Sequence, residues 1–195
     1  MSDPSHDLIE KERQKYEQMW ELKAYRASQT NVPQVSIFID IGGIPAGSTV
    51  ADIGCGPGYA SLRFHEYGMK VVALDIAANA LTDEARRVVD FHCGSVWEIP
   101  EGVSADYGFC TDMMEHIPTE KVDQTLTSIR KMVANCVYFE ISLRHDKSGA
   151  AIGEVLHMTV QSTAWWTDAM GKHWKTVEVI RENPRDKSVV LLAIP

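Results

Sequence analysis

Short apolar runs alternate with amphipathic stretches along most of the chain, and this alternation predicts its architecture. The apolar runs are short enough to be strands, and they fall at 50–53, 70–74, 88–93, 105–110, 135–143, 174–181 and 187–194. Helices are predicted between the first five runs, at 59–67, at 77–87 and after Thr119, a suitable N-cap. Strands alternating with helices predict an α/β fold in which a mostly parallel sheet has helices on both faces.

The first 43 residues have a different pattern, with two helices and no strand. A long helix is predicted from Ser5 to Ala27 and a shorter one from Gln34 to Asp40. A chain of 195 residues fits one domain with one core. We therefore expect a single domain over residues 1–195, with an N-terminal helical cap at about 5–43.

A glycine-rich loop follows the first strand and precedes a helix. Gly54, Gly56 and Gly58 stand at alternate positions, where glycine lets a ligand approach the backbone closely. Asp52 ends the strand, and its carboxylate is expected to point into the same crevice. Asp75 ends the next strand, where an acidic side chain can accept hydrogen bonds from both hydroxyls of a ribose. These residues predict a ligand that contains adenosine.

Charge and cysteine content narrow the class of protein. The formal net charge of −8 argues against nucleic-acid binding, which depends on clustered Lys and Arg. The four cysteines are far apart and form no C-x-x-C zinc pattern, so we expect small buried thiols in a reducing compartment. No apolar run is long enough to span a membrane. We therefore predict a cytoplasmic protein with no membrane partner.

Three segments resemble the class I S-adenosylmethionine-dependent methyltransferases, and more narrowly the type 11 group that includes ubiquinone-biosynthesis enzymes. Residues 52–58 have the acidic lead and alternate glycines of that family. The segment 112–118, Asp-Met-Met-Glu-His-Ile-Pro, resembles its D-x-x-E-H-I-P motif after the fourth strand. Residues 94–100 resemble its G-D-x-x-x-L-P segment, with Ser95 at the acidic position. The final hairpin is typical of the same family and absent from the usual dinucleotide fold.

The resemblance implies a Rossmann-like, seven-stranded sheet of order 3-2-1-4-5-7-6, in which strand 7 is antiparallel. It implies S-adenosyl-L-methionine as cofactor, and a leading helix that covers the cofactor site. Two alternatives follow for that helix. Either it contacts cofactor or substrate through Tyr16, Trp20, Tyr25 and Arg26, or its aromatic residues only pack it onto the sheet. The cofactor-binding residues expected from the resemblance are Asp52, Gly54, Cys55, Gly56, Gly58, Asp75, Ile76, Ser95, Val96 and Thr111.

The methyl acceptor is expected to be a small molecule with an oxygen or nitrogen nucleophile, because only the N-terminal helix and residues 144–170 remain to build its site. A hydroxyl or protonated amine also needs a base. The candidates for the catalytic residues are His157, His116 and Asp112, each of which could instead have only a structural role. No metal is expected, since residues 140–142, Glu-Ile-Ser, lack the adjacent acidic and amide ligands of a metal-assisted mechanism.

Two alternatives of other classes stay open at this point. One is a catalytically inactive module that binds S-adenosylmethionine without turnover. The other is an NAD-dependent oxidoreductase, since a glycine loop after a strand also occurs in dinucleotide-binding folds. The identity of the acceptor and the oligomeric state are not determined by the sequence.

Overall fold

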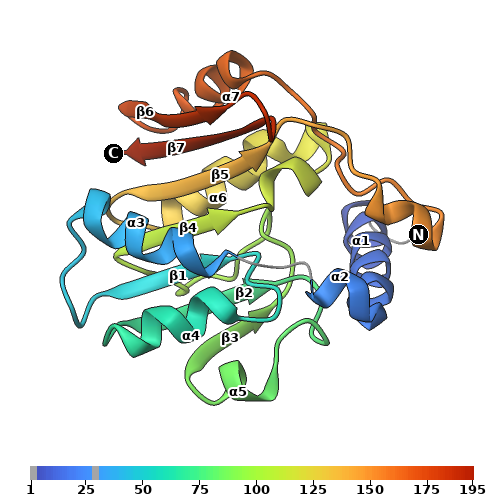
Figure 1. Cartoon of the computed structure of the whole chain (residues 1–195), viewed down its shortest axis with the longest axis horizontal. Coiled ribbons are helices and arrows are strands. Elements are labelled where there is room, and N and C mark those ends of the chain that lie inside the picture. The colour runs from blue at the N-terminus through green and yellow to red at the C-terminus, as the bar shows by residue number, and fades with distance from the viewer. Residues whose placement is uncertain (1–3, 28–30) are drawn as a thin grey trace.

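Seven strands form one sheet in the order β3-β2-β1-β4-β5-β7-β6 (Figure 1). The computed structural model describes residues 4–27 and 31–195. β7 runs antiparallel to both of its neighbours, and the other strand pairs are parallel. This arrangement confirms the predicted sheet. The strands are β1 Thr49–Ile53, β2 Lys70–Asp75, β3 Val89–Cys93, β4 Tyr107–Thr111, β5 Val137–Ser142, β6 Thr176–Asn183 and β7 Ser188–Ile194.

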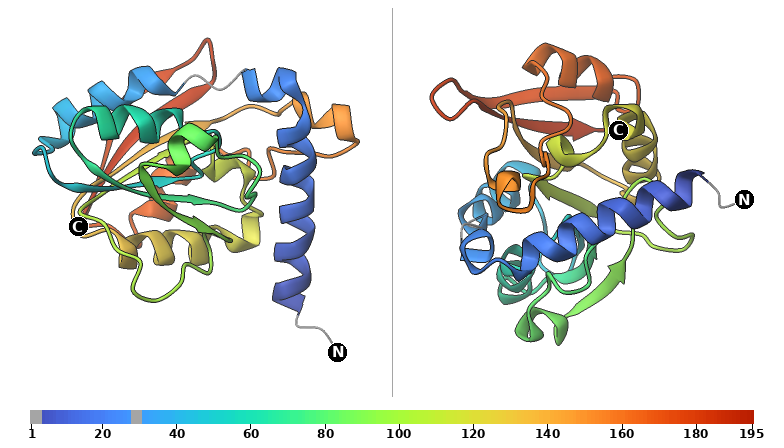
Figure 2. Two further views of the ribbon diagram at one scale, coloured as in Figure 1. Left: turned by 90° about the horizontal axis from the view of Figure 1, so that it is seen from below. Right: turned by 90° about the vertical axis from the view of Figure 1, so that its right-hand side faces the viewer.

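Helices cover both faces of this sheet (Figure 2). In the left view, α3 and α4 lie above the sheet and α6 lies below it. The α-helices are α1 Pro4–Glu21, α2 Lys23–Ala27, α3 Val32–Gly42, α4 Tyr59–Glu66, α5 Asp83–Arg86, α6 Val122–Met132 and α7 Thr163–Met170. Short 3₁₀ turns are η1 Met114–His116, η2 Thr119–Lys121 and η3 Ser148–Ile152.

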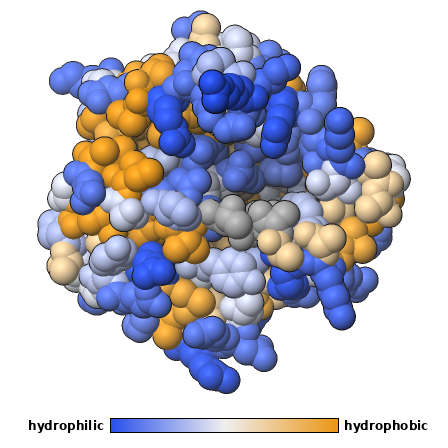
Figure 3. All heavy atoms as spheres, viewed as in Figure 1, coloured by the Kyte–Doolittle hydropathy of each residue, from blue (hydrophilic) through white to orange (hydrophobic). Residues whose placement is uncertain are grey.

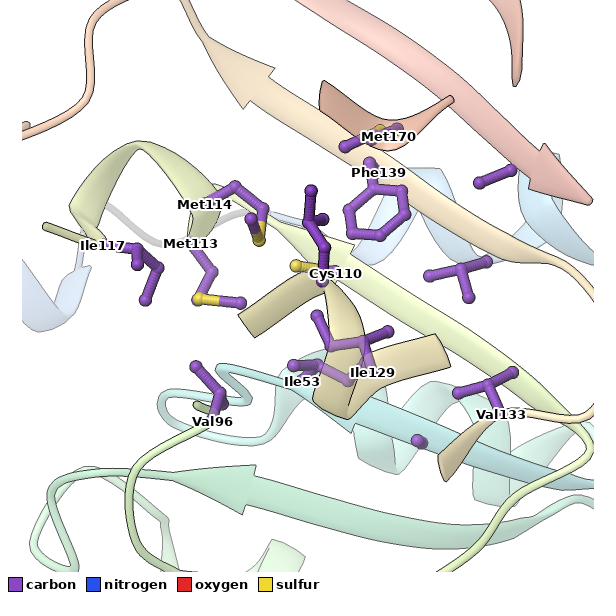
Figure 4. Close-up of a cluster of buried hydrophobic side chains, with 14 of the residues drawn as sticks. Ile53, Val96, Cys110, Met113, Met114, Ile117, Ile129, Val133, Phe139 and Met170 are labelled. Atoms are coloured by element: carbon purple, nitrogen blue, oxygen red, sulfur yellow. The ribbon is translucent and has the colours of Figure 1, made fainter. Parts of the chain in front are cut away.

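The two faces of the sheet bury two separate sets of side chains, because successive residues of a strand point to opposite sides. Phe109 and Tyr138 pack with α3 and α4 on one face. Their chain neighbours Cys110 and Phe139 pack with α6 and α7 on the other face (Figure 4). All six residues of β5 are buried, as expected for a strand covered on both faces.

The core that contains Cys110 and Phe139 extends at one end to the carboxyl ends of the strands. Val96, Met113 and Ile117 lie together at that end of the cluster in Figure 4. The same three side chains line a cavity described below. The core therefore supports the site directly, and substitutions of these residues would affect both.

Helix α1 stands beside the sheet and does not lie flat on either face (Figure 2). Its Met19 and Trp20 are buried. The single helix predicted from Ser5 to Ala27 is interrupted at Leu22, whose backbone N–H donates to the carbonyl of Met19, and α2 continues at an angle. The predicted N-terminal helices therefore exist, with one additional break.

Local hydrogen bonds account for two predictions that were wrong. The helix predicted at 77–87 is only the single turn α5, because the Thr82 hydroxyl accepts from the backbone N–H of Ala85 and starts the helix there. Thr119 does not cap α6: its hydroxyl pairs with that of Thr159 at 2.8 Å, and α6 begins later, at Val122. Ser162, by contrast, caps α7, because its hydroxyl accepts from the backbone N–H of Trp165.

The cysteines differ in their exposure to solvent. All four cysteines are free. Cys93 is exposed, whereas the sequence predicted buried thiols. The cytoplasmic location rested in part on that expectation and stays a prediction. In the part of the chain described, none of the helices combines the length and hydrophobicity needed to cross a bilayer.

The face seen in Figure 3 is largely hydrophilic, with hydrophobic residues gathered on its left side. Ile37 and Ile41 of α3 are among the large hydrophobic side chains that the protein exposes.

Candidate active site

Two adjoining cavities lie at the carboxyl ends of the strands. The first spans about 750 Å³, part of it open to solvent. Its floor is formed by the loops that follow β1, β2, β3 and β4, and its opposite wall by α1 and α2. This position, where the strand order reverses between β1 and β4, is the usual ligand site of open α/β sheets.

The glycine loop forms part of this floor, but its three glycines have different neighbours. A Cβ at Gly54 would lie 2.4 Å from Met113, and one at Gly58 would lie 2.5 Å from Ala85. A Cβ at Gly56 would lie 3.0 Å from the ring of Trp20, across the cavity. Gly54 and Gly58 are therefore required by the packing of the protein itself, and Gly56 keeps open the space between the loop and α1.

Asp75 links the end of β2 to the glycine loop. Its carboxylate accepts the backbone N–H groups of Gly56 and Ala77, each at 2.9 Å. Burial raises the pKa of Asp75 to about 6. A buried carboxylate on the cavity wall retains further lone pairs that can accept from hydroxyls of a bound ligand.

Asp52 lies behind the loop, away from the cavity. Its carboxylate accepts the Ser61 hydroxyl at 2.5 Å, and this bond holds the first turn of α4 against β1. Burial, with a smaller contribution from the charge of Asp75, raises the pKa of Asp52 to about 6. Its side chain is absent from the residues that line the cavity, so it does not point into the crevice as expected.

Seven of the ten expected cofactor residues line the first cavity: Gly54, Cys55, Gly56, Asp75, Ile76, Val96 and Thr111. Asp52, Gly58 and Ser95 do not. The hydroxyl of the buried Ser95 accepts from the backbone N–H of Trp97 at 3.3 Å, which orders the loop after β3. Ser95 thus contributes to the shape of this loop from inside the protein.

The wall opposite the glycine loop is aromatic. Tyr16 and Trp20 of α1 and Tyr25 of α2 line the cavity, and the rings of Trp20 and Tyr25 are 4.8 Å apart. Arg26, also a candidate for contact with ligand, is directed elsewhere. Its guanidinium donates to the carbonyls of Trp20, Asn79 and Ala80, and so anchors α2 to the loop after β2.

Several lining residues were not identified from the sequence. Glu12 is buried in an ion pair with Lys15 and reaches the cavity from α1, where a charged residue is ordinarily expected to face solvent. Asn31 also lines the cavity and donates to the hydroxyl of Thr111 at 3.1 Å. No local pattern distinguishes these residues, because their neighbours come from distant parts of the chain.

The second cavity is wider and adjoins the first. Its lining includes Ser142 at the end of β5, residues 144–148 after that strand, His157, and Arg185 and Lys187 around the turn between β6 and β7. Tyr25, Asp112 and His116 line both cavities. The structure therefore places His116 and Asp112, two of the predicted catalytic residues, on the shared wall, and the third, His157, on the wall of the second cavity.

The side chains at the shared wall have unusual electrostatics. Burial, and to a smaller extent the charge of His157, lowers the pKa of His116 to about 3, so its imidazole is neutral. Desolvation and the charge of Glu140 raise the pKa of Asp112 to about 6. Asp112 also has a backbone φ of +48°, which few residues other than glycine adopt. Such strain and displaced pKa values are typical of functional sites.

The second cavity has a basic rim on a protein of net charge −8. Four cationic side chains contribute to it: Arg144, Lys147, Arg185 and Lys187. Apart from the buried Glu115, the acidic residues that line it are Asp112 and Asp146. The cavity can therefore accept a ligand with a negatively charged group more readily than the surface as a whole.

A family model described as a methyltransferase domain matches residues 50–135, from β1 to the start of β5. The sheet order is that of the class I fold expected from the sequence. Residues 50–135, less than half of the chain, are therefore similar to a methyltransferase domain. The matched part of the methyltransferase domain contains the glycine loop, Asp75 and the segment from Asp112 to His116. It does not contain α1, His157 or the final hairpin.

Curated relatives resemble the same part of the chain. The ubiquinone biosynthesis O-methyltransferase of Idiomarina loihiensis is 30% identical over 83 residues, and that of Xanthomonas axonopodis pv. citri is 34% identical over 82. Each match covers 38% of this chain and 34% of the relative. The chain thus matches about a third of the length of these relatives.

Solved structures extend the likeness of fold beyond that part. The structure described as the DhpI–SAH complex aligns with a TM-score of 0.74 at 18% identity, and the match covers 97% of this chain and 98% of the other. The magnesium protoporphyrin IX methyltransferase of Synechocystis PCC 6803 with bound SAH aligns with a TM-score of 0.65 at 18% identity, covering 84% and 81%. Nearly the whole chain therefore has the methyltransferase fold.

Proposed function

We propose that this protein transfers a methyl group from S-adenosylmethionine to an oxygen or nitrogen atom of a small molecule. The observation that carries the proposal is the pair of cavities that share a wall at Tyr25, Asp112 and His116. A cofactor in the first cavity and an acceptor in the second would meet at this wall, as a bimolecular transfer requires.

The residues of the first cavity fit this cofactor. Asp75 offers carboxylate lone pairs to ribose hydroxyls, and the space in front of Gly56 would be filled by any Cβ at that position. The rings of Trp20 and Tyr25 offer aromatic faces, which attract a cationic group such as a sulfonium. When bound, the cofactor supplies an activated methyl group that the acceptor's lone pair takes, while the electron pair of the broken carbon–sulfur bond stays on sulfur.

The contribution of the chain to this reaction is position and proton uptake. Tyr16 and Tyr25 separate the cavities from bulk water on the side of α1 and α2. His116, His157 and Asp112 lie where the acceptor's nucleophilic atom would be held, and they provide groups that can orient it and receive its proton. Correct placement alone is worth about 7–11 kcal/mol in such reactions.

The basic rim supports a small acceptor with an acidic group. Arg144, Lys147, Arg185 and Lys187 would attract it toward the second cavity. Two kinds of protein described above have names that mention small molecules, namely ubiquinone biosynthesis and magnesium protoporphyrin IX. The proposal extends only that general class to this chain.

Cofactor binding is tested first, with S-adenosylhomocysteine and NAD added separately to the full chain. S-adenosylhomocysteine at about 100 times its Kd should stabilise the protein by about 2.7 kcal/mol. For a chain of this size that raises Tm by roughly 5–11 °C. NAD should give no shift. A shift with NAD alone would support the oxidoreductase alternative and contradict the proposal.

The acceptor side is tested with His157→Ala. Methyl transfer from labelled S-adenosylmethionine into a filtered small-molecule extract should fall by roughly 10²-fold or more, the scale of a lost acid–base or positioning group. Affinity for S-adenosylhomocysteine should stay nearly constant, because His157 does not line the first cavity. Full turnover by the variant would assign the acceptor site to the N-terminal helices instead.

A further inference from the structure

Three potential metal ligands converge at the boundary of the two cavities. Glu115, His116 and His157 each offer one ligand atom, and these atoms all lie within 4.8 Å of one another. The backbone holds them together, since the N–H groups of Met158 and Thr159 both donate to the carbonyl of Glu115, at 2.8 and 2.9 Å. The segment that carries His157 is thereby fastened to η1, which carries the other two ligands.

Both imidazoles are oriented by backbone carbonyls through the same ring nitrogen. Nδ1 of His157 lies 2.6 Å from the carbonyl oxygen of Arg144. Nδ1 of His116 lies 3.2 Å from the carbonyl oxygen of Leu156 and 2.8 Å from the hydroxyl oxygen of Tyr16. Because a carbonyl oxygen can only accept, the contact with Arg144 places the proton of His157 on Nδ1 and leaves the lone pair of the neutral ring on Nε2. In the same tautomer of His116, Nδ1–H donates both to the carbonyl of Leu156 and to the hydroxyl oxygen of Tyr16, and Nε2 is free to bind a metal. Metal-binding histidines are oriented in this way, with the other ring nitrogen donating to a carbonyl.

The buried side chain of Glu115 is a second observation, independent of the histidines, that points to a cation. The residue is completely buried, and its Oε1 accepts the backbone N–H of Ser142 at 3.2 Å. Its Oε2 is also buried and has no hydrogen-bond partner among the described residues. Leaving a buried polar atom unpaired costs about 1–3 kcal/mol, and more for a charged group. A cation held between this carboxylate and the two imidazoles would remove that cost.

We propose that Glu115, His116 and His157 bind a divalent transition-metal ion of the zinc class. Two imidazole nitrogens and one carboxylate oxygen suit Zn²⁺, Co²⁺ or Fe²⁺, whereas Mg²⁺ and Ca²⁺ prefer an all-oxygen set. Three protein ligands leave an open position, as in catalytic zinc sites. The proposal reverses the expectation of no metal, which considered only the residues that end the fifth strand.

The role of the ion rests on the proposed methyl transfer and narrows its acceptor to a hydroxyl compound. An acceptor oxygen in the open position would become more acidic, as metal-bound water does. Its proton would pass to Asp112, which lines the same two cavities. The oxygen lone pair then forms the bond to the methyl carbon as the carbon–sulfur bond breaks and its electron pair goes to sulfur. His116 and His157 would thus act as ligands, and Asp112 as the proton acceptor.

A titration of the metal-free full chain with Co²⁺ tests the site without cofactor or acceptor. One equivalent should bind, with visible absorption bands that added Zn²⁺ abolishes. His157→Ala should weaken Co²⁺ binding by at least about tenfold, because loss of even an outer partner of a metal ligand costs 10–100-fold. His65→Ala is the matched control: His65 is exposed on α4, and its removal should leave the titration unchanged.

Glu115→Gln examines the carboxylate ligand, and should weaken Co²⁺ binding in the same way. If that variant fails to fold, His157→Ala remains decisive, because His157 is only half-buried. Absence of saturable Co²⁺ binding, or equal binding by His157→Ala and the unaltered chain, overturns the metal site. S-adenosylhomocysteine binding and methyl transfer that both survive chelation would overturn it while leaving the proposed function intact. Co²⁺ binding without methyl transfer to any acceptor would remove the proposed function alone.

Discussion

The glycines on either side of α4 illustrate how one residue type meets two demands. Gly58 and Gly68 have nearly the same backbone angle, with φ of +80° and +79°. A Cβ at Gly58 would lie 2.5 Å from Ala85, whereas one at Gly68 would meet nothing within 4 Å. Backbone conformation is therefore the only demand at Gly68, and at Gly58 steric exclusion adds to it.

A pair of alanine substitutions separates these demands. Gly68→Ala should reduce the free energy of unfolding by about 1–2 kcal/mol, the cost of a side chain in the left-handed region. Gly58→Ala should cost about 1–3 kcal/mol more, the range for overpacking. Urea unfolding of the two variants gives the difference. Equal losses would mean that α5 moves aside freely and that its packing against the loop contributes little.

At the scale of elements, the N-terminal helices form one wall of the cofactor cavity without joining the sheet. Apolar side chains of α1 are buried, and polar contacts add to this attachment. Arg26 donates to the carbonyls of Asn79 and Ala80, and the Asn79 side chain donates to the carbonyl of Glu17 at 2.9 Å. Tyr16 adds a bond to His116 at 2.8 Å. The cap is therefore held by a few contacts at defined points.

Arg26→Ala should loosen this cap while leaving the sheet intact. Losing hydrogen bonds from a charged donor to carbonyls costs about 1.5–3 kcal/mol, reduced here by partial solvent exposure. We expect S-adenosylhomocysteine to bind about tenfold more weakly, and limited proteolysis to cut the first 30 residues faster. Arg13→Ala is the control, since among the described residues Arg13 forms ion pairs only with Glu10 and Glu17 of the same helix, where such pairs contribute little. Equal affinities for the two variants would show that the cap does not depend on Arg26.

At the scale of the whole molecule, buried carboxylates make stability depend on pH. Asp52 is 2% exposed, and its pKa of about 6 in the folded protein lies above its ordinary value of 3.8. The folded state therefore holds this proton more tightly than the unfolded state. The associated stability is fully present below about pH 4 and is lost as the pH rises through 6.

Asp52→Asn should remove this dependence. Its amide keeps an oxygen acceptor and gains a donor that can face the hydroxyl of Ser61. A pKa difference of about two units corresponds to about 3 kcal/mol, so the variant should be up to that much more stable at pH 7 and equal to the unaltered protein near pH 4. Thermal unfolding between pH 4 and 8 measures the difference. A variant less stable at pH 7 would mean that the charge of Asp52 stabilises the fold there, through its bond from the Ser61 hydroxyl.

Much of the fold could be predicted because its signals are local. An apolar run with turn residues on either side identifies a strand, and β5, with all six residues buried, is the clearest case. The glycine loop and Asp75 were identified from their positions directly after a strand, and the segment from Asp112 to His116 from its resemblance to a methyltransferase motif. Two predicted helix starts were wrong because side-chain hydrogen bonds decided them. Thr82 and Thr119 form hydrogen bonds that the spacing of apolar residues does not reveal.

The sequence by itself determined the strands, the loop that faces the cofactor and the methyltransferase resemblance, because these depend on residues adjacent in the chain. Only the tertiary structure decided that Asp52 faces away from the cavity while Glu12 enters it, and that His157 meets Glu115 and His116. Burial, charge and hydrogen-bond partners at these positions come from segments far apart in the chain. A single sequence contains no local pattern that fixes which distant segments pack together, so the cofactor wall and the metal cluster had to be found in three dimensions.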